Sequence, residues 1–384
     1  MTPSPRKILV VIGSLEVGGA ERQIVEIARL LQGPDFQFHV VTTAAGGPLE
    51  APLRATGATC ETLGPPGAHP PRSKSERAWR AVRNAAALRG ILRRRRPDLI
   101  HSYLTETSAI AAAARWPGRA PFHVYSKRSL VRWIAREAVY FPLVKWTNAR
   151  ADLILANSHA VAEESIRKEG TPAAKIRVVH NGVDTDLYRP GPRSDALAGE
   201  LGIPAGSPVV GMIANLHLYK GHADVLRACA SWGQPDLRLV FVGREGNASD
   251  SVRRLVAELG LAERVVFTGP RTDVPELLRL FDVFVSASHE EGFSNSILEA
   301  MASGCGIVAT AVGGTVEQIE DGKSGCLVPP EDPAAIERAL RRLFDTPDFL
   351  AKVRGNARAR AVERFSLAAL RDAMAEIYGA VRPG

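Results

Sequence analysis

Two glutamates eight residues apart mark the most informative segment of the sequence. Glu291 lies in EEGFSNSILEAM (290–301), which follows the strand-like run VFVSAS (283–288) and leads into a helix. Glu299 comes about two helical turns later in the apolar stretch ILEAMASG, where an ionised carboxylate is costly without a partner. Carboxylates accept paired hydrogen bonds from the vicinal hydroxyls of a ribose or hexose. The pair therefore indicates a sugar- or nucleotide-binding site, although capping and exposure would also explain Glu291.

Backbone amides between the two glutamates add hydrogen-bond donors. The first N–H groups of a helix have no partner inside the helix, and they favour anions. We expect four such amides to be unpaired and free to bind hydroxyls or phosphate, those of Gly292, Phe293, Ser294 and Asn295. A further glycine loop, GGTVE (313–317), follows the strand-like run GIVAT (306–310). It could approach a ligand closely, or its glycines could serve only a backbone with positive φ.

Three other groups could contact an anion or a sugar. Lys220 follows the strand-like run PVVGMIANL (208–216), where it would meet a diphosphate as a point charge, although most lysines are simply solvated. Gly18 and Gly19 join the first strand to the first helix, and a turn without a ligand explains them equally well. His101 is expected at the carboxyl end of DLIHSY (98–103), and a hydrogen-bonded structural histidine is its simpler explanation.

Strand-like and helical patterns alternate along nearly all of the 384 residues, which predicts an α/β fold with mostly parallel sheets. The length suits two Rossmann-like domains, at 1–187 and 197–365, joined by a Pro- and Gly-containing linker at 188–196. An amphipathic segment at 366–384 completes the chain. Ligands bind beyond the carboxyl ends of such strands, so we expect the two domains to face a cleft.

Composition indicates which metals, compartment and partners to expect for the protein. The four cysteines lack metal-ligand spacing, and neither Asp-x-Asp nor a histidine cluster suggests a metal site, so no metal is expected. Because the cysteines are far apart in the sequence, we expect them to be reduced core thiols of a cytoplasmic protein, and the strand-sized apolar runs are too short to span a bilayer. The net charge is +8, and residues 1–150 hold 23 Lys and Arg against 10 Asp and Glu. This basic half favours an anionic lipid surface or lipid-linked acceptor, or is merely a soluble basic surface. No nucleic acid partner is expected.

A second membrane signal is the segment 128–145, which interleaves three aromatic residues, Trp133, Tyr140 and Phe141, with Arg and Lys. Such a segment could lie peripherally at the inner face of a membrane, although an ordinary helix docked on the sheet is the commoner case.

Nearly the whole chain resembles the retaining glycosyltransferases of family four, which have the GT-B fold. The most specific motif is Glu291-x7-Glu299; further similar segments are Gly18-Gly19-Ala20-Glu21, Ser126–Leu130, Ala156-Asn157-Ser158, Asn181–Asp184 and Phe365-Ser366. The resemblance implies that the C-terminal helix crosses back to the first domain. It also implies a nucleotide diphosphate sugar as donor substrate, with no cofactor, and a glycan or lipid-linked acceptor.

The resemblance assigns roles to single residues. Glu299 would hold the donor ribose, Glu291 and the following amides the donor sugar, and Lys220 the diphosphate. The nucleobase would lie near Gly269, Pro270 and Arg271, and His101 would touch the donor sugar or the acceptor.

Two positions depart from the family pattern. Asn215 stands where the family usually has an arginine that partners the lysine, and Gly304-Cys305-Gly306 replaces a common Gly-x-Pro. The first departure concerns catalysis, and either the amide of Asn215 or the side chain of Arg244 could fill the gap. A sugar-nucleotide epimerase remains an alternative because it would share the fold. Asn215 also leaves a catalytically silent sugar-nucleotide-binding protein open, although Lys220, Glu291 and Glu299 argue against it.

Overall fold

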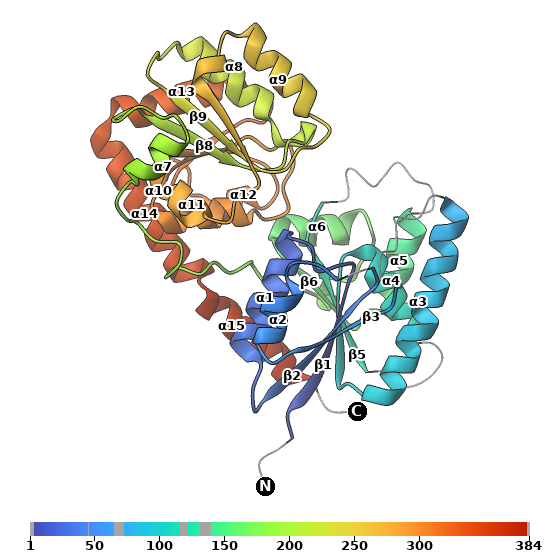
Figure 1. Ribbon diagram of the computed structural model, residues 1–384. Helices are drawn as coiled ribbons and strands as arrows, with labels where there is room; N and C mark the ends of the chain where they lie inside the picture. Colours follow the sequence, from blue (N-terminus) through green and yellow to red (C-terminus); the bar gives the residue numbers. More distant parts are fainter. Residues whose placement is uncertain (1–3, 45, 65–72, 116–120, 131–139, 382–384) are drawn as a thin grey trace. The chain divides into compact units, whose positions relative to one another are not determined.

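Parallel strands alternate with helices in two separate units (Figure 1). The computed structural model describes residues 4–44, 46–64, 73–115, 121–130 and 140–381. Unit 1 comprises Met1–Asn181 and Leu367–Gly384, and unit 2 comprises Gly182–Ser366. The α/β fold with two Rossmann-like units is as predicted. The segment 188–196 is not a free linker, because it belongs to unit 2, where Arg358 donates hydrogen bonds to the carbonyls of Thr185 and Tyr188.

Unit 1 contains a parallel sheet in the order β3-β2-β1-β4-β5-β6-β7. Its strands are β1 (Arg6–Ile12), β2 (Phe36–Thr42), β3 (Thr59–Thr62), β4 (Leu99–Tyr103), β5 (Phe122–Lys127), β6 (Leu153–Ala156) and β7 (Ile176–Val178). The sequence did not predict β3 and β7. Both are short strands at the edges of the sheet, and neither contains an apolar run long enough to be recognised.

Helices cover both faces of this sheet. They are α1 (Gly19–Leu31), α2 (Glu50–Ala55), α3 (Lys74–Arg95), α4 (Thr105–Ala114), α5 (Tyr140–Arg150), α6 (His159–Arg167) and α15 (Leu367–Ala380), with a 3₁₀ turn η1 (Ala173–Lys175). Alternate residues of β1 belong to two different hydrophobic cores, one on each face of the sheet, because successive side chains along a strand point to opposite faces. Ile8 and Val10 pack with α1 and α15, whereas Leu9 and Val11 pack with α3 and α4.

Unit 2 contains a second parallel sheet, in the order β10-β9-β8-β11-β12-β13. Its strands are β8 (Val209–Ile213), β9 (Arg238–Val242), β10 (Val265–Gly269), β11 (Val283–Ser286), β12 (Gly306–Thr310) and β13 (Cys326–Val328). Its helices are α7 (Asp195–Glu200), α8 (His222–Trp232), α9 (Ser249–Glu258), α10 (Val274–Leu280), α11 (Asn295–Ser303), α12 (Thr315–Gln318), α13 (Pro333–Asp345) and α14 (Pro347–Phe365), with 3₁₀ turns η2 (Leu218–Lys220) and η3 (Ala262–Arg264). Among the helices of the described residues, none is long and apolar enough to span a bilayer.

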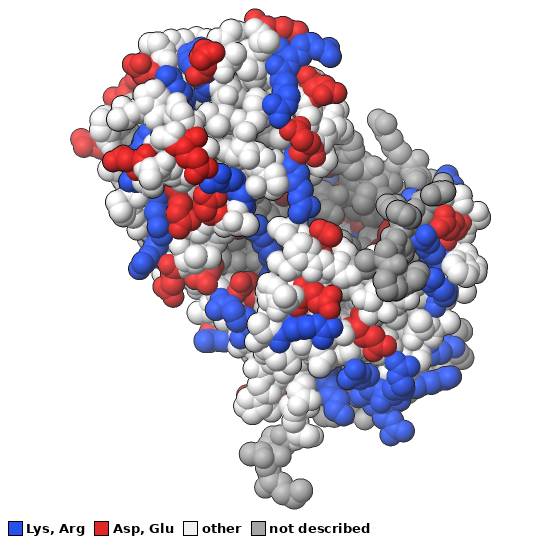
Figure 2. Space-filling view, viewed as in Figure 1, with Lys and Arg blue, Asp and Glu red and all other residues white. Residues whose placement is uncertain are grey.

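Basic side chains are unevenly distributed on the surface of unit 1. Figure 2 shows Lys and Arg gathered at the lower right, where α3 ends in Figure 1. The last turn of α3 contains Arg93, Arg94 and Arg95.

Candidate functional site

In unit 2 the strand order reverses between β8 and β11, which are neighbours in the sheet but lie far apart in the sequence. Ligands of open parallel sheets bind at such a reversal, beyond the carboxyl ends of the strands. The loops that follow β8 and β11 contact each other there, because the amide of His289 donates a hydrogen bond to the carbonyl of Tyr219 at 2.7 Å.

Lys220 and Glu291 meet at this strand reversal. Nζ of Lys220 lies 2.7 Å from Oε2 of Glu291, and the two side chains are 19% and 17% exposed. Burial alone would lower the pKa of Lys220, but attraction and hydrogen bonding by the Glu291 carboxylate outweigh it and raise the pKa above its ordinary value. At neutral pH Lys220 is therefore a protonated ammonium group whose position is fixed by the ion pair with Glu291, and not a solvated surface lysine.

Gly221 brings the Lys220 loop close to the end of β11. Its φ is +74°, and a Cβ at this position would lie 2.0 Å from the carbonyl oxygen of Ala287. Both the backbone conformation and the available space therefore require glycine. The close approach places Lys220 within reach of Glu291.

The loops after β11 and β12 are also joined. The amide of Gly314, in the predicted glycine loop, approaches the carbonyl oxygens of Gly292 and Glu291 at 3.1 and 3.3 Å. The loop that contains Glu291 is thus held on one side by Lys220 and on the other by Gly314.

One expectation about the amides that precede α11 is wrong. The N–H of Ser294 is not free, because it donates to Oε1 of Gln318 at 3.2 Å. The side-chain amide of Gln318 in turn donates to the carbonyl of Ser294 at 2.7 Å, and the Ser294 hydroxyl caps α11 by accepting from the amide of Ile297. Ser294 is therefore part of the support of the site, and its amide is not available for phosphate.

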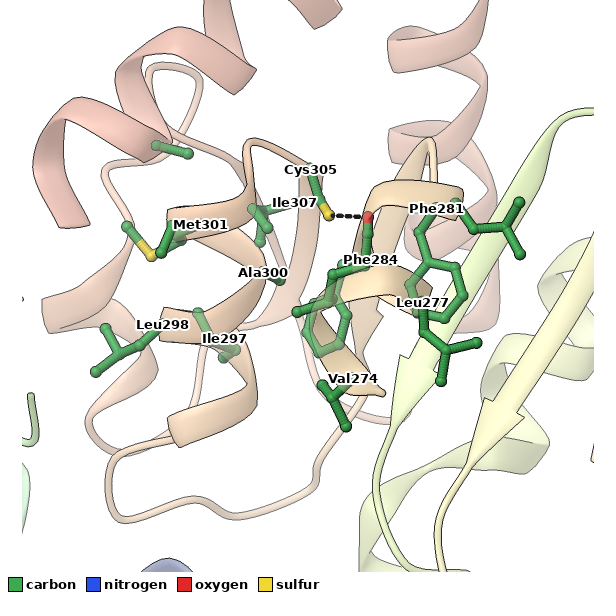
Figure 3. Close-up of a cluster of buried hydrophobic side chains, with 14 of the residues drawn as sticks. Val274, Leu277, Phe281, Phe284, Ile297, Leu298, Ala300, Met301, Cys305 and Ile307 are labelled. Atoms are coloured by element: carbon green, nitrogen blue, oxygen red, sulfur yellow. Dashed lines mark hydrogen bonds between the residues drawn. The ribbon is translucent and has the colours of Figure 1, made fainter. Parts of the chain in front are cut away.

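Glu299 lies in the second turn of α11 and is 8% exposed. The helix is anchored by apolar side chains on two sides, packing against α14 as well as α10 and the central strands. In Figure 3, Ile297 and Ala300 lie toward Phe284, whereas Leu298 and Met301 point to the other side of the helix. Leu298 and Ala300, which flank Glu299 in the sequence, are completely buried. The burial expected from the sequence is thus observed, and the rigid helix fixes the position of the carboxylate.

Comparisons with known proteins identify the family. Glycosyltransferase Family 4 matches residues 17–187, and Glycosyl transferases group 1 matches residues 194–360. EpsD of Bacillus subtilis (strain 168), described as a putative glycosyltransferase, is 32% identical over an alignment of 266 positions that covers 67% of this chain and 68% of EpsD. The chain belongs to the group 1 glycosyltransferases of family 4.

Two further similar proteins align with nearly the whole chain. A D-inositol 3-phosphate glycosyltransferase of Streptomyces avermitilis is 28% identical over 96% of this chain and 84% of its own. The crystal structure of Anabaena HepE in complex with UDP-glucose superposes with a TM-score of 0.84 at 26% identity, covering 97% of this chain and 99% of HepE. The predicted GT-B fold is therefore confirmed.

Asn215, the departure from the family-4 pattern, connects the loops after β8 and β9. Its Oδ1 accepts a hydrogen bond from the amide of Arg244 at 2.9 Å. Gly243 allows this contact, because a Cβ there would lie 2.2 Å from the carbonyl oxygen of Ala214. The side chain of Arg244 is exposed at the end of β9, the strand next to β8.

The segment proposed from the family resemblance to contact the nucleobase lies at the end of β10, the edge strand. Gly269 has φ +68°, and its carbonyl accepts from the amide of Gly243 at 3.1 Å. Arg271, beyond Pro270, pairs with Asp273 at 2.6 Å and Glu200 at 2.7 Å, and hydrogen bonds to these carboxylates raise its pKa. Its guanidinium is thus engaged within unit 2.

In unit 1 the strand order reverses between β1 and β4. Gly18 is the N-cap of α1, in an extended conformation, and Gly19 is the first helical residue. A Cβ on Gly18 would lie 2.3 Å from Oε2 of Glu21, a flexible side chain that can move aside. The two glycines follow β1 at this strand reversal, where open parallel sheets commonly bind ligands, but the packing around Gly18 does not itself require glycine.

His101 has a different environment from the one expected. It lies in the middle of β4 and is completely buried. Nδ1 is 2.6 Å from the hydroxyl of Tyr378, and Nε2 is 2.7 Å from Oγ of Ser126. Both ring nitrogens are therefore occupied, which agrees with the structural alternative and corrects the expected contact with donor or acceptor.

Two residues that shape the site have no role assigned from the sequence. Gln318 holds Ser294 from the helix α12, and no local pattern indicates this contact. Gly221 follows Lys220 directly, and a Lys-Gly pair between a strand and a helix is a signal for a tight turn that could have been used.

Proposed function

We propose that this chain is a retaining glycosyltransferase that moves a sugar from a UDP- or GDP-sugar to an acceptor hydroxyl. The observation that carries the proposal is the 2.7 Å ion pair between Lys220 and Glu291 at the strand reversal of unit 2. Family membership supplies the reaction class. The complex of HepE with UDP-glucose favours a UDP-sugar as the donor.

Lys220 fits the charge that develops in this reaction. A bond forms between the acceptor oxygen and the anomeric carbon on the same face from which the β-phosphate oxygen departs, so the configuration is kept. The proton of the acceptor hydroxyl passes to the departing phosphate oxygen or to water, and the nucleoside diphosphate leaves with the electron pair of the broken bond. A fixed cation beside the leaving oxygen stabilises that charge, so the pair of catalytic carboxylates used by glycosidases is not needed.

The carboxylates and loops have binding roles in this proposal. Glu291 accepts hydrogen bonds from donor-sugar hydroxyls, and Glu299, fixed on α11, accepts them from the ribose. Arg244 supplies the second cation, in place of the arginine that family members usually have at position 215. The base lies against the backbone near Gly269, and the reaction proceeds without metal because side-chain cations supply the positive charge.

The acceptor in this proposal is a lipid-linked or polysaccharide-precursor glycan, processed in the cytoplasm. The basic character of residues 1–150 supports an acceptor that is itself anionic or is presented at an anionic surface.

A panel of UDP- and GDP-sugars tests the proposal. Thermal shift identifies the donor, since a ligand at about 100 times its Kd adds about 2.7 kcal/mol of stability. Transfer to an acceptor library is then followed by NMR of the anomeric configuration, with and without EDTA. Transfer with retention, unaffected by EDTA, is the expected result.

Other outcomes would contradict the proposal in distinct ways. An epimerised donor without transfer would indicate an epimerase, and tight binding without turnover would indicate a binding protein. An inverted product would contradict retention, and loss of activity in EDTA that Mg²⁺ restores would contradict metal independence.

A further inference from the structure

The outward side of α3 carries apolar side chains where a surface helix is normally polar. Its inner side packs on the sheet of unit 1 through Leu88 and Ile91, which are essentially completely buried. On the opposite side Trp79 is 61% exposed and Val82 is 71% exposed, and their spacing of three residues places them next to each other on the helix surface. Leaving a tryptophan and a valine in water sacrifices the free energy that their burial would provide.

Cations are frequent along α3, and Arg83 and Arg93 lie on the same side of the helix as Trp79 and Val82. The sequence of α3 contains eight Lys and Arg residues and a single acidic residue, Glu76. Within the described part of the chain, only Arg80 and Arg94 among these cations form ion pairs, with Glu76 and Glu61. The guanidinium of Arg83 lies 5.2 Å from the Trp79 ring centroid, which joins the basic and apolar parts of the face.

We propose that this α3 face, comprising Trp79, Val82, Arg83 and Arg93, which lie within about 60° of Trp79 around the helix, docks on an anionic lipid bilayer. Trp79 and Val82 enter the boundary between headgroups and acyl chains, where tryptophan is favoured, and the cations pair with lipid phosphates. Charge complementarity selects anionic over neutral lipid. The exposed Trp–Val pair selects a bilayer over other polyanions, because only the bilayer offers an apolar layer beneath its charges.

The location differs from that suggested by sequence. Of the segment 128–145, residues 131–139 lie outside the described residues. The α3 face is proposed because its Trp79 and Val82 side chains are exposed in the structure. The helix has 22 residues and is about 33 Å long, which is enough to contact many lipids. Docking of α3 does not depend on the sugar-transfer reaction, so the two proposals can fail separately.

Flotation of the full chain with large unilamellar vesicles tests the docking. Phosphatidylcholine vesicles are compared with vesicles that contain a third phosphatidylglycerol, at low and at physiological salt. We expect binding to the anionic vesicles only, weakened by salt. The double variants Trp79→Ser/Val82→Ser and Arg83→Glu/Arg93→Glu should each reduce the bound fraction at limiting lipid at least fivefold.

Matched controls lie in unit 2. Arg338→Glu/Lys352→Glu changes the net charge equally at exposed positions, and Leu218→Ser removes a side chain that is 56% exposed. Both should bind vesicles like the parent. Absence of parent binding to anionic vesicles at low salt would refute the docking, as would equal losses in the controls. Tight binding to RNA that survives Trp79→Ser/Val82→Ser, with none to vesicles, would identify nucleic acid as the partner instead.

Discussion

The side-chain amide of Gln318 binds both polar backbone groups of Ser294, accepting from its N–H at 3.2 Å and donating to its carbonyl at 2.7 Å. Gln318 ends α12 and is completely buried, whereas Ser294 caps α11. This contact fixes the start of the helix that bears Glu299, and it ties the loop containing Glu291 to the end of β12.

Gln318→Leu should therefore destabilise the protein and impair donor binding. The change leaves a buried N–H and a buried carbonyl without partners, at a cost of about 2–3 kcal/mol. Denaturant unfolding measures this cost, and calorimetry with nucleoside diphosphate measures the affinity. Gln37→Leu at an exposed position of β2 is the control. Unchanged stability in Gln318→Leu would mean that Ser294 is satisfied in another way.

Lys220→Ala should reduce turnover at least a hundredfold at saturating donor. Removal of one preorganised group that stabilises developing charge typically costs about 3–4 kcal/mol. Lys220→Arg should rescue only partly, because a planar guanidinium does not replace a compact ammonium at a fixed position. Lys323→Ala, at a side chain that is 73% exposed, is the control. If Lys220→Ala turns over like the parent, the diphosphate is held elsewhere.

The Lys220–Glu291 pair should also have a defined pH dependence. Because the folded protein raises the pKa of Lys220 above its ordinary 10.5, the stabilisation is fully present below that value and is lost as pH rises through the folded pKa. The difference in unfolding free energy between parent and Glu291→Gln should thus be constant from pH 7 to 9 and shrink above 10.5. A difference that grows with alkaline pH would contradict the pair.

Glu299→Ala should weaken nucleoside diphosphate binding by about 2 kcal/mol, or roughly thirtyfold, through loss of charge-assisted hydrogen bonds. Isothermal titration calorimetry measures the affinity. Because Glu299 lies between buried side chains, circular dichroism must show that α11 remains folded. Glu299→Gln, which keeps the shape, separates charge from packing. Equal affinity in parent and Glu299→Ala would exclude the ribose contact.

Arg244→Ala should lower turnover about tenfold or more if Arg244 supplies the second cation. Asn215→Arg places a cation at the position that family members usually use, so Arg244→Ala should cost less in that background. A double-mutant cycle on the transfer rate measures this coupling. Independent effects of the two substitutions would show that Arg244 does not compensate for Asn215.

Three buried histidines should make the fold sensitive to acid. Burial lowers the pKa of His101 well below the usual value, that of His123 to about 3 and that of His222 to about 4. Below about pH 6.5 these histidines bind protons in the unfolded chain but not in the folded chain. The free energy of unfolding therefore falls with pH, and each histidine contributes up to about 1.4 kcal/mol for each pH unit. Urea unfolding from pH 7 to 5 should show this. His123→Gln should flatten the slope.

The sequence determined those features that depend on neighbouring residues. Alternation of apolar strands and amphipathic helices specified the parallel α/β architecture, and the Glu291-x7-Glu299 spacing specified a loop carboxylate followed by a buried helical one. Such patterns can be read because they reflect the local period of each element. The short edge strands β3 and β7 could not be read, since neither has enough apolar residues to show a period.

Only the tertiary structure decided which distant residues meet. Lys220 reaches Glu291, 71 residues away, because β8 and β11 are neighbours in the sheet, and strand order is not encoded in any local pattern. His101 lost its expected role for the same reason. Its ring is covered by Tyr378, 277 residues later, on a helix that packs on unit 1 although it follows unit 2 in the chain. Burial of a large apolar surface brings α15 there, and the histidine then becomes part of the core.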